Sequence, residues 1–286
     1  MKSFITVVIL VILISLAAFV FGWGRDIFFA SKTPSQTSTP TQSLTVSPTP
    51  PQKEIELYLP APTDKKVGTK FVIYGKGRGF ESQINYRISD AKDGRELLLG
   101  NLMINAEMGK FGYFYKEIDL KKELKTLPTA IILSVFEFSA KDGSEINKTS
   151  LELEVDSNST AVFAYFNNNN IDPEISCNKT FAVARLVPKT QSTLKAAMEE
   201  LLKGPTAAEA KLGFGTSINP GVTINSVKVS GNTATIDFSP KLEEKVGGSC
   251  RVAAIRSQIT NTAKQFSNIK NVIISINGET ELILQP

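Results

Sequence analysis

Histidine is absent from this chain of 286 residues, which also contains only two cysteines and one tryptophan. Without imidazole the chain cannot form a serine or cysteine triad that uses histidine as its base. Zinc sites that need imidazole ligands are excluded for the same reason. Any catalysis would therefore have to rely on carboxylates or lysine.

A strongly basic surface is also lacking, because the formal net charge is only +4. Neither half of the chain combines a dense patch of Lys and Arg with interleaved aromatic residues, which nucleic-acid binding would need. We therefore expect no nucleic acid among the partners.

Charged residues are missing between Phe4 and Trp23, a stretch preceded by Lys2 and followed by Arg25 and Asp26. About twenty apolar residues are enough to cross a membrane as a helix. Lys2 favours a cytoplasmic N-terminus, which would leave the rest of the chain outside. A cleaved secretory signal is the alternative, but its apolar region usually has only about 7 to 15 residues. We predict a single-pass protein of the cell membrane with extracytoplasmic C-terminal domains.

Apolar residues are sparse between Ser31 and Lys53, where Ser, Thr, Pro and Gln dominate. Such a segment buries too little apolar surface to offset the entropy of ordering. Its prolines favour an extended stalk, which at about 3.1 Å per residue reaches roughly 70 Å at most. We predict a multidomain chain with a membrane anchor over residues 1–30, a linker over 31–53, and folded domains over 54–156 and 160–286.

The first predicted domain is a succession of short apolar runs typical of β-strands. The pairs Asp93-Gly94 and Asp142-Gly143 lie between such runs, where glycine readily supplies the positive φ of a hairpin turn. Seven short strands predict an all-β sandwich. The runs are Ile55 to Leu59, Lys70 to Gly75, Ile84 to Ser89, Leu97 to Ile104, Phe111 to Ile118, Ala130 to Phe138 and Ser150 to Val155.

Four short strings in this domain carry a family resemblance: Leu59-Pro60-Ala61-Pro62, Val72 to Gly77 with Phe80-Glu81, Asp93-Gly94, and Phe111-Gly112-Tyr113-Phe114. With these strings the segment resembles the immunoglobulin-like domain of bacterial spore germination proteins. The resemblance implies an immunoglobulin-like sandwich that serves as a non-catalytic adhesive or spacing module.

The second predicted domain mixes strands with two amphipathic helices. One helix is predicted from about Gln191 to Lys203, with Thr190 as its N-cap and Gly204-Pro205 as its stop. The other is predicted from about Cys250 to Phe266. Helices that cover one face of a sheet predict an α+β fold. The candidate strands are Ala161 to Phe166, Thr180 to Val187, Val222 to Val229, Thr233 to Phe238, Asn271 to Ile276 and Glu281 to Leu284.

A second resemblance covers about Ala161 to Pro286. Its strongest element is Leu201-Leu202-Lys203-Gly204-Pro205-Thr206 with Glu209, and further strings are Val162 to Phe166, Val183 to Pro188 and Val229 to Ser239. Thr206 and Glu209 have the spacing of a capping box at a helix start. The segment resembles the GerMN domain of sporulation and spore germination proteins. The resemblance implies an envelope scaffold or binding role.

Acidic residues offer the remaining route to catalysis, because glycan cleavage needs two carboxyl groups about 5 to 9.5 Å apart. The candidates are Asp172, Glu174, Asp237, Glu243 and Glu244. Asp172 and Glu174 lie in the Asn-rich loop from Asn167 to Glu174, and Glu243 and Glu244 lie among lysines. Solvated loop charges therefore explain both pairs more simply. We therefore predict that the chain is not an enzyme and has no catalytic residue, cofactor or metal site.

Cys177 and Cys250 are the only cysteines, and both lie in the second domain. Outside the membrane, pairing in a disulfide is the economical interpretation. The alternative is a reactive thiolate at Cys250, because a helix N-terminus lowers the pKa of a thiol. We predict the disulfide.

Arg185 is the first candidate binding residue. It alternates with Phe181, Val183 and Val187, so it points to an apolar face, where an unpaired charge is costly. We expect a carboxylate partner, as in a structural ion pair, or a ligand. The second candidate is the loop Gly247-Gly248-Ser249, whose backbone N–H groups could face an anion at a helix start.

Together these features predict a membrane-anchored bacterial envelope protein that binds a protein partner or peptidoglycan without catalysis. A carboxylate-dependent cell-wall hydrolase and an extracytoplasmic ligand sensor are the alternatives.

Overall fold

The computed structural model describes residues 53–285. All of the described residues belong to one compact unit. The predicted anchor, with its apolar stretch from Phe4 to Trp23, and nearly all of the predicted stalk lie outside the described residues. Across residues 53–285, no helix is both long enough and apolar enough to span a membrane.

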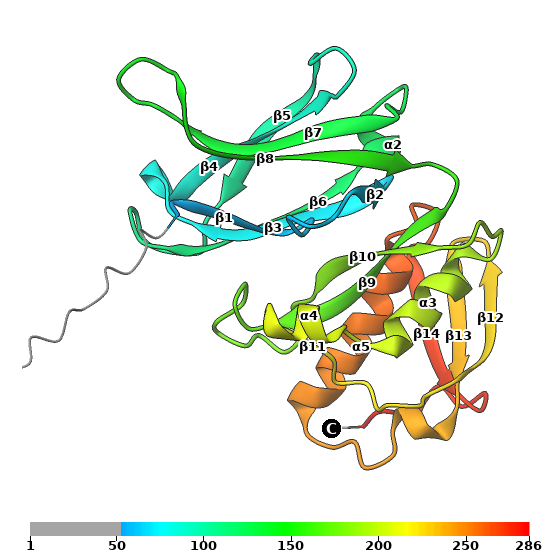
Figure 1. The fold of residues 1–286 in the computed structure, drawn as a ribbon. Coiled ribbons are helices and arrows are strands. Elements are labelled where there is room, and N and C mark those ends of the chain that lie inside the picture. Colours follow the sequence, from blue (N-terminus) through cyan, green and yellow to red (C-terminus); the bar gives the residue numbers. More distant parts are fainter. Residues whose placement is uncertain (1–52, 286) are drawn as a thin grey trace, which may run out of the picture. The chain divides into compact units, whose positions relative to one another are not determined.

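The first half is a sandwich of two sheets (Figure 1). One sheet has the strand order β1-β3-β6 and the other β2-β8-β7-β4-β5. The elements are β1 (Ile55–Leu59), β2 (Lys66–Gly68), β3 (Lys70–Gly77), η1 (Phe80–Ser82), β4 (Gln83–Asp90), β5 (Glu96–Met103), β6 (Gly112–Asp119), α2 (Leu120–Glu123), β7 (Ala130–Phe138) and β8 (Glu145–Asp156).

Alternating side chains of the two sheets meet in one core. Ile84 and Ile88 on β4 are fully buried, as are Leu133 on β7 and Phe114 on β6. All seven predicted strands are present, but β8 begins at Glu145 rather than near Ser150. Its first residues pair with the end of β7 and are mostly polar and exposed, so no apolar alternation reveals them in the sequence.

The second half packs two helices between two sheets (Figure 1). The sheets have the orders β10-β9-β11 and β12-β13-β14, and β14 runs parallel to β13. The elements are β9 (Thr160–Asn168), β10 (Phe181–Val187), α3 (Thr193–Lys203), α4 (Ala207–Lys211), β11 (Phe214–Gly215), β12 (Ile224–Ser230), β13 (Thr233–Phe238), η2 (Pro240–Leu242), α5 (Ser249–Lys264) and β14 (Asn271–Ile276).

Two predictions in this half are wrong in detail. The segment from Glu281 to Leu284 is not a strand, because side chains rather than a neighbouring strand bind its backbone. Arg256 donates to the carbonyl of Ile283, and the N–H of Leu284 donates to Glu243. Helix α3 has its N-cap at Ser192 rather than Thr190.

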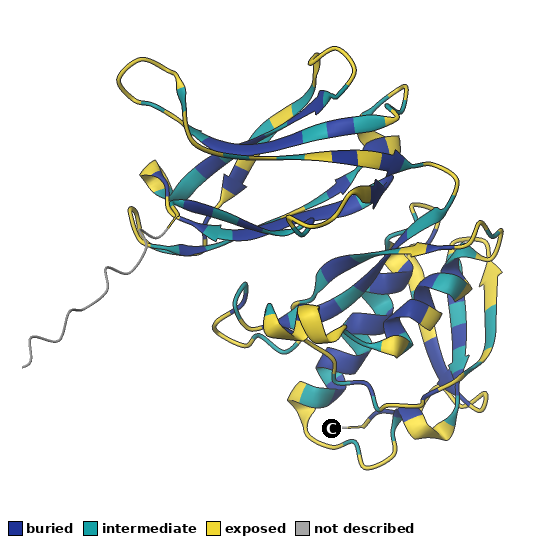
Figure 2. Cartoon of the chain, viewed as in Figure 1, coloured by how far each residue is buried: buried dark blue, intermediate teal, exposed yellow. Residues whose placement is uncertain are grey.

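The outer face of sheet β1-β3-β6 is covered by the second half. The consecutive residues from Phe71 to Gly75 in β3 are all buried (Figure 2). Successive residues of a strand face opposite sides of the sheet, so both faces of β3 are covered. Tyr74 is fully buried and lies edge-on to Phe214, with ring centroids 5.5 Å apart, and its hydroxyl donates to the carbonyl of Leu212 at 2.8 Å. Tyr115 and Phe181 form a second such pair at 5.3 Å. The two halves therefore share buried apolar surface.

Buried hydroxyl groups also find partners across this contact. The Tyr165 hydroxyl donates to Glu117 at 2.7 Å, and the Ala182 N–H donates to the Tyr115 hydroxyl at 2.6 Å. Burial, reinforced by the charge of Glu117, raises the pKa of both phenols well above the ordinary value. They remain protonated at neutral pH, so each keeps its hydrogen-bond donor.

At Gly68 the two halves approach too closely for a side chain. A Cβ atom there would lie 2.6 Å from Leu186 Cδ2 and 2.7 Å from Ala161 Cβ. Glycine at the end of β2 thus permits a close backbone approach.

Candidate functional site

Arg185, the candidate binding residue on β10, is held by two carboxylates. Its Nη1 and Nη2 atoms lie 2.6 and 2.7 Å from the two carboxylate oxygens of Glu209, and its Nε lies 3.6 Å from Glu200. Only 13% of the Arg185 side chain is exposed. Because a planar guanidinium matches a carboxylate in two parallel hydrogen bonds, the pair has a fixed geometry. The expected carboxylate partner is therefore confirmed.

Glu209 has a second role at the start of helix α4. Its side chain accepts from the Thr206 N–H at 2.8 Å, while the Thr206 hydroxyl accepts from the Glu209 N–H at 3.3 Å. This is the predicted capping box. The carboxylate of Glu209 thus both caps α4 and fixes Arg185. The Gly-Pro-Thr-x-x-Glu run therefore does more than end helix α3.

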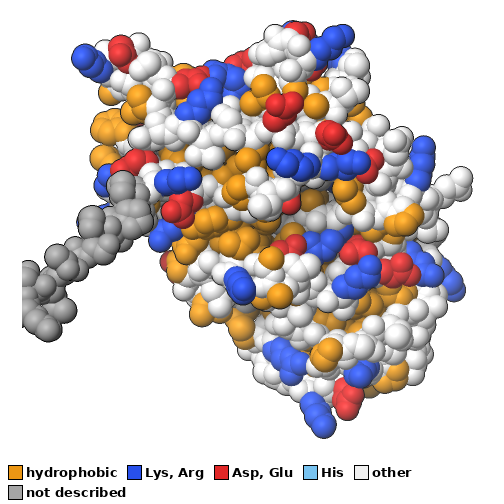
Figure 3. Space-filling view, in the orientation of Figure 1, with side chains coloured by type: hydrophobic (Ala, Val, Ile, Leu, Met, Phe, Trp, Pro, Cys, Tyr) orange, Lys and Arg blue, Asp and Glu red, His pale blue; other side chains and the backbone are white. Residues whose placement is uncertain are grey.

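A cleft of about 300 Å³ lies beside this ion pair, between the sandwich and the second half. Exposed Asp64 and Lys66 stand at its edge, while Arg185 and Glu209 form part of its wall. Figure 3 shows hydrophobic side chains with acidic and basic groups among them along the boundary between the two halves. The remaining wall is mostly apolar and comes from Leu59, Pro60, Val67, Gly68, Phe71, Val72, Val183, Ala184 and Leu186, with Lys70 as its one further charged residue.

The loop Gly247-Gly248-Ser249 lies elsewhere. Gly248 is the N-cap of α5 with a φ of 84°, and all three residues are exposed. Near the other end of α5, Gln265 donates to the carbonyl of Phe163, which pairs with Ala184 beside Arg185. A helix of 16 residues is about 24 Å long. The structure therefore does not bring the two candidate binding elements together.

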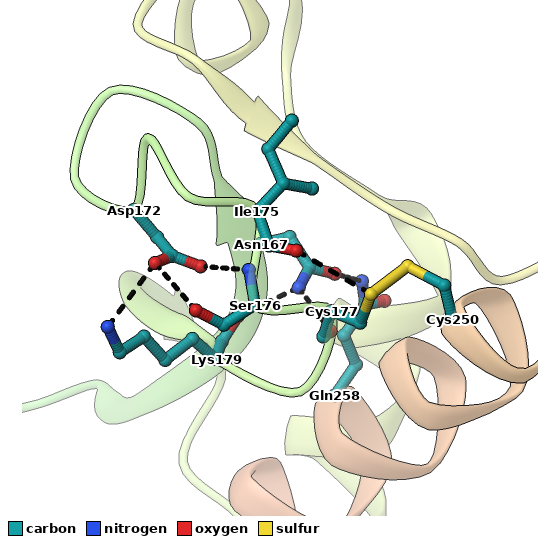
Figure 4. Close-up of a disulfide and its surroundings, with 8 residues drawn as sticks. All are labelled: Asn167, Asp172, Ile175, Ser176, Cys177, Lys179, Cys250 and Gln258. Carbon is teal, nitrogen blue, oxygen red and sulfur yellow. Dashed lines mark hydrogen bonds and ion pairs between the residues drawn. A yellow bond between two sulfur atoms is a disulfide. The ribbon is translucent and has the colours of Figure 1, made fainter. Parts of the chain in front are cut away.

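The predicted disulfide joins Cys177 to Cys250 with an S–S distance of 2.04 Å. It ties the connection between β9 and β10 to the first turn of α5 (Figure 4). Beside it, Asn167 donates to the carbonyls of Cys177 and Lys179, both at 2.8 Å, and accepts from Gln258 at 2.7 Å. These contacts fix the loop from several directions.

Two of the candidate catalytic carboxylates are engaged in hydrogen bonds. Burial alone would raise the pKa of Asp172, but the Ser176 backbone and hydroxyl and the Lys179 ammonium outweigh it and lower that pKa. The pKa of Asp237 is lowered in the same way by Ser275, the Gly278 N–H and Asn225. A general acid needs a raised pKa, so neither carboxyl is suited to that role.

Metal-binding geometry is not found in the part of the chain that the structure describes. No group of three or more Cys, Asp and Glu residues between 53 and 285 is arranged to hold a metal ion.

The tyrosine contact between the halves was not predicted, although the sequence contains a signal for it. Strand β6 places Tyr113 and Tyr115 on one face and Phe114 on the other, and β3 contains the unbroken apolar run from Phe71 to Tyr74. A strand of a simple two-layer sandwich is apolar on one face only, whereas a continuous apolar run indicates that both faces are covered.

Comparisons with known proteins agree with both resemblances. The family described as "Immunoglobulin-like domain of bacterial spore germination" (Gmad2) matches residues 54–144. The family described as "Sporulation and spore germination" (Germane) matches residues 164–282. No curated protein matches the chain.

Two solved structures also align with the chain. The tandem GerMN domains of the sporulation protein GerM from Bacillus subtilis share 23% identity over 44% of this chain and 42% of that chain, with a TM-score of 0.34. The first GerMN domain of the same protein shares 28% identity over 43% of this chain and 86% of that chain, with a TM-score of 0.33. The chain thus spans less than half of the tandem-domain structure.

These structural scores are low, so the assignment rests on the two family matches. Residues 54–144 belong to the Gmad2 immunoglobulin-like family and residues 164–282 to the Germane (GerMN) family of sporulation and spore germination domains.

Proposed function

We propose that the chain is a membrane-anchored envelope protein whose two domains form a non-catalytic binding or scaffold module outside the cytoplasm. The uncharged stretch from Phe4 to Trp23 supports the anchor. The disulfide between Cys177 and Cys250 supports an oxidising compartment, since structural disulfides are rare in the cytosol.

The cleft between the two docked domains is the observation that carries the proposal. Its walls come from both domains, and the domains contact each other through the buried Tyr74 and the half-buried Tyr115 and Tyr165, whose hydroxyl groups are all hydrogen-bonded. The contact keeps the cleft preformed, and preformed sites lose less conformational freedom on binding. Concave, mostly apolar sites with a few polar groups are typical of ligand binding.

The environment of three carboxylates in the described part of the chain supports binding rather than turnover. Among the described residues, Asp172 and Asp237 have lowered pKa values, and the buried Glu209 is occupied by Arg185 and Thr206. A protein partner or peptidoglycan is therefore the proposed ligand, with the exposed Lys66 and Asp64 as the polar contacts at the cleft.

Photocrosslinking in native membranes tests this proposal. A photoreactive amino acid in place of Lys66 in the full chain is expected to give a discrete adduct with a protein or with the cell-wall fraction. The matched control is Lys228, an exposed lysine on β12 away from the cleft lining. An adduct pattern that is the same at both positions, or no adduct at Lys66, would contradict binding at the cleft.

A further inference from the structure

The sandwich has six large exposed apolar side chains, and most of them lie at one of its ends. Phe80 is 70% exposed, Met103 64%, Met108 62% and Phe138 46%. They come from four places in the chain: η1, the end of β5, the loop before β6, and the end of β7. We name this set of four residues the apolar tip.

Strand pairing places the four residues at the same end of the domain. Met103 pairs with Gln83, which directly follows η1 and its Phe80. Strands β4 and β7 are antiparallel, and Asn85 of β4 pairs with Phe136 of β7. Phe138, two residues later in β7, therefore lies beside the start of β4. The loop with Met108 begins after Ile104, whose N–H donates to Ser82 in η1 at 2.8 Å.

The opposite end of the sandwich has no such feature. Its connections include the β4–β5 turn and the segment between α2 and β7, residues 91–95 and 124–129. Within residues 53–285, none of the large exposed apolar side chains falls in either connection. The asymmetry shows that the exposure at the apolar tip is a local feature and not a general property of this domain.

The backbone of η1 is strained where it presents Phe80. Glu81 and Ser82 have φ values of 57° and 55°, in the left-handed region that non-glycine residues rarely adopt. Two consecutive residues of this kind cost free energy, and such strain is concentrated at functional sites.

The end with the apolar tip is also the end at which the described chain starts. Ile55 pairs with Gly77, and the Arg78 N–H donates to the carbonyl of Glu54 at 3.1 Å. The 52 residues before this point include the apolar stretch from Phe4 to Trp23. If that stretch is the proposed anchor, the tethered chain enters the described domain at the end that carries the apolar tip.

Charged groups near the apolar tip are balanced. Arg78 is paired with Glu54, and Lys148 is paired with Glu145, 2.8 Å away. The tip therefore lacks the excess of Lys and Arg that draws a surface to anionic lipids. Phe and Met would instead enter the interface through their apolar area.

We propose that the apolar tip inserts into the outer surface of the bilayer that anchors the chain. Extended apolar patches on a soluble domain mark contact with a membrane or a protein, and the position of the tether favours the membrane. A tether keeps the domain at a high effective concentration near the membrane, so even weak insertion is populated. The domains then lie against the bilayer with a defined orientation. This inference rests on the proposed anchor.

Fluorescence of the full chain in vesicles of zwitterionic phospholipid tests the inference. An environment-sensitive fluorophore is attached to Met108→Cys in the apolar tip, with the native disulfide intact. The emission of this fluorophore is expected to shift to the blue, and brominated lipids should quench it. High salt should change neither the shift nor the quenching. The matched control is Lys125→Cys, exposed at the opposite end of the same domain beyond β6 and α2; its emission should match that in water.

The outcomes separate the two proposals. If the chain stays with the vesicles after alkaline extraction but the probe at position 108 reports water, the anchor stands and the insertion of the apolar tip is refuted. If the chain is extracted, both proposals fail. Since these vesicles contain no other protein, a blue-shifted and quenched probe at position 108 supports contact with lipid and not with a protein partner. Substitution of Phe80 and Met103 by Ser should then abolish the shift.

Discussion

Replacing Arg185 with methionine is expected to lower the free energy of unfolding by about 3–5 kcal/mol. The side chains of Arg185, Glu209 and Glu200 are only 13%, 10% and 12% exposed. Methionine fills part of the space but leaves the carboxylate of Glu209 buried without its guanidinium. The unfolding midpoint in urea, measured for wild type and variant, gives the change.

The same substitution at an exposed arginine shows whether the loss of stability comes from the buried ion pair or from the loss of a positive charge alone. Arg95 is 66% exposed, and its pairs with Asp90 and Asp93 are 3.7 and 3.8 Å long. Arg95→Met should therefore change the stability by about 0.5 kcal/mol or less. Adding Glu209→Gln to Arg185→Met should recover part of the loss, because it removes the unpaired charge. Equal effects of the two arginine substitutions would show that the Arg185 ion pair is not structural.

Removing the disulfide should have an effect of similar size. Cys177 and Cys250 are 73 positions apart, and opening a loop of that length releases about 4 kcal/mol of restraint on the unfolded chain in the entropy model. The double variant Cys177→Ser with Cys250→Ser should unfold at a correspondingly lower urea concentration. Reductant should destabilise the wild type by the same amount and leave the double variant unchanged.

Thiol titration provides the control for that comparison. The unreduced protein is expected to have no titratable thiol, and the reduced protein should have two. Two free thiols in the native protein, or a wild type that does not respond to reductant, would contradict the structural role of the disulfide.

Local patterns in the sequence were enough to predict most elements of the fold. The bounds of β1, β7, β13 and β14 agree with the prediction, because each strand has apolar residues at regular positions between turn residues. The capping box followed from the separation of Thr206 and Glu209 by three positions. The disulfide followed from the presence of only two cysteines in a domain expected to lie outside the cytoplasm.

Side-chain contacts between residues far apart in the sequence could not be predicted in the same way. The alternation along β10 predicted that Arg185 has a partner, but it did not identify Glu209, which lies 24 positions away. The presence of Glu209 was already explained by its role as a capping residue. The segment from Glu281 to Leu284 has the composition of a strand, and only the side chains of Arg256 and Glu243 determine that it does not pair.

The cleft and the domain contact depend on the same kind of information. Tyr74 and Tyr115 meet their partners on β10, β11 and the preceding loop more than 60 positions later. The sequence shows that β3 and β6 have two apolar faces, but it does not show which surface covers the second face.

Incubating the domains with purified peptidoglycan is the most direct test of the central claim that this is a binding module and not an enzyme. The account predicts that the protein co-sediments with the sacculi or remains free, and that no soluble muropeptide is released in either case. Release of muropeptides that is lost on Asp172→Asn or Asp237→Asn would contradict the account.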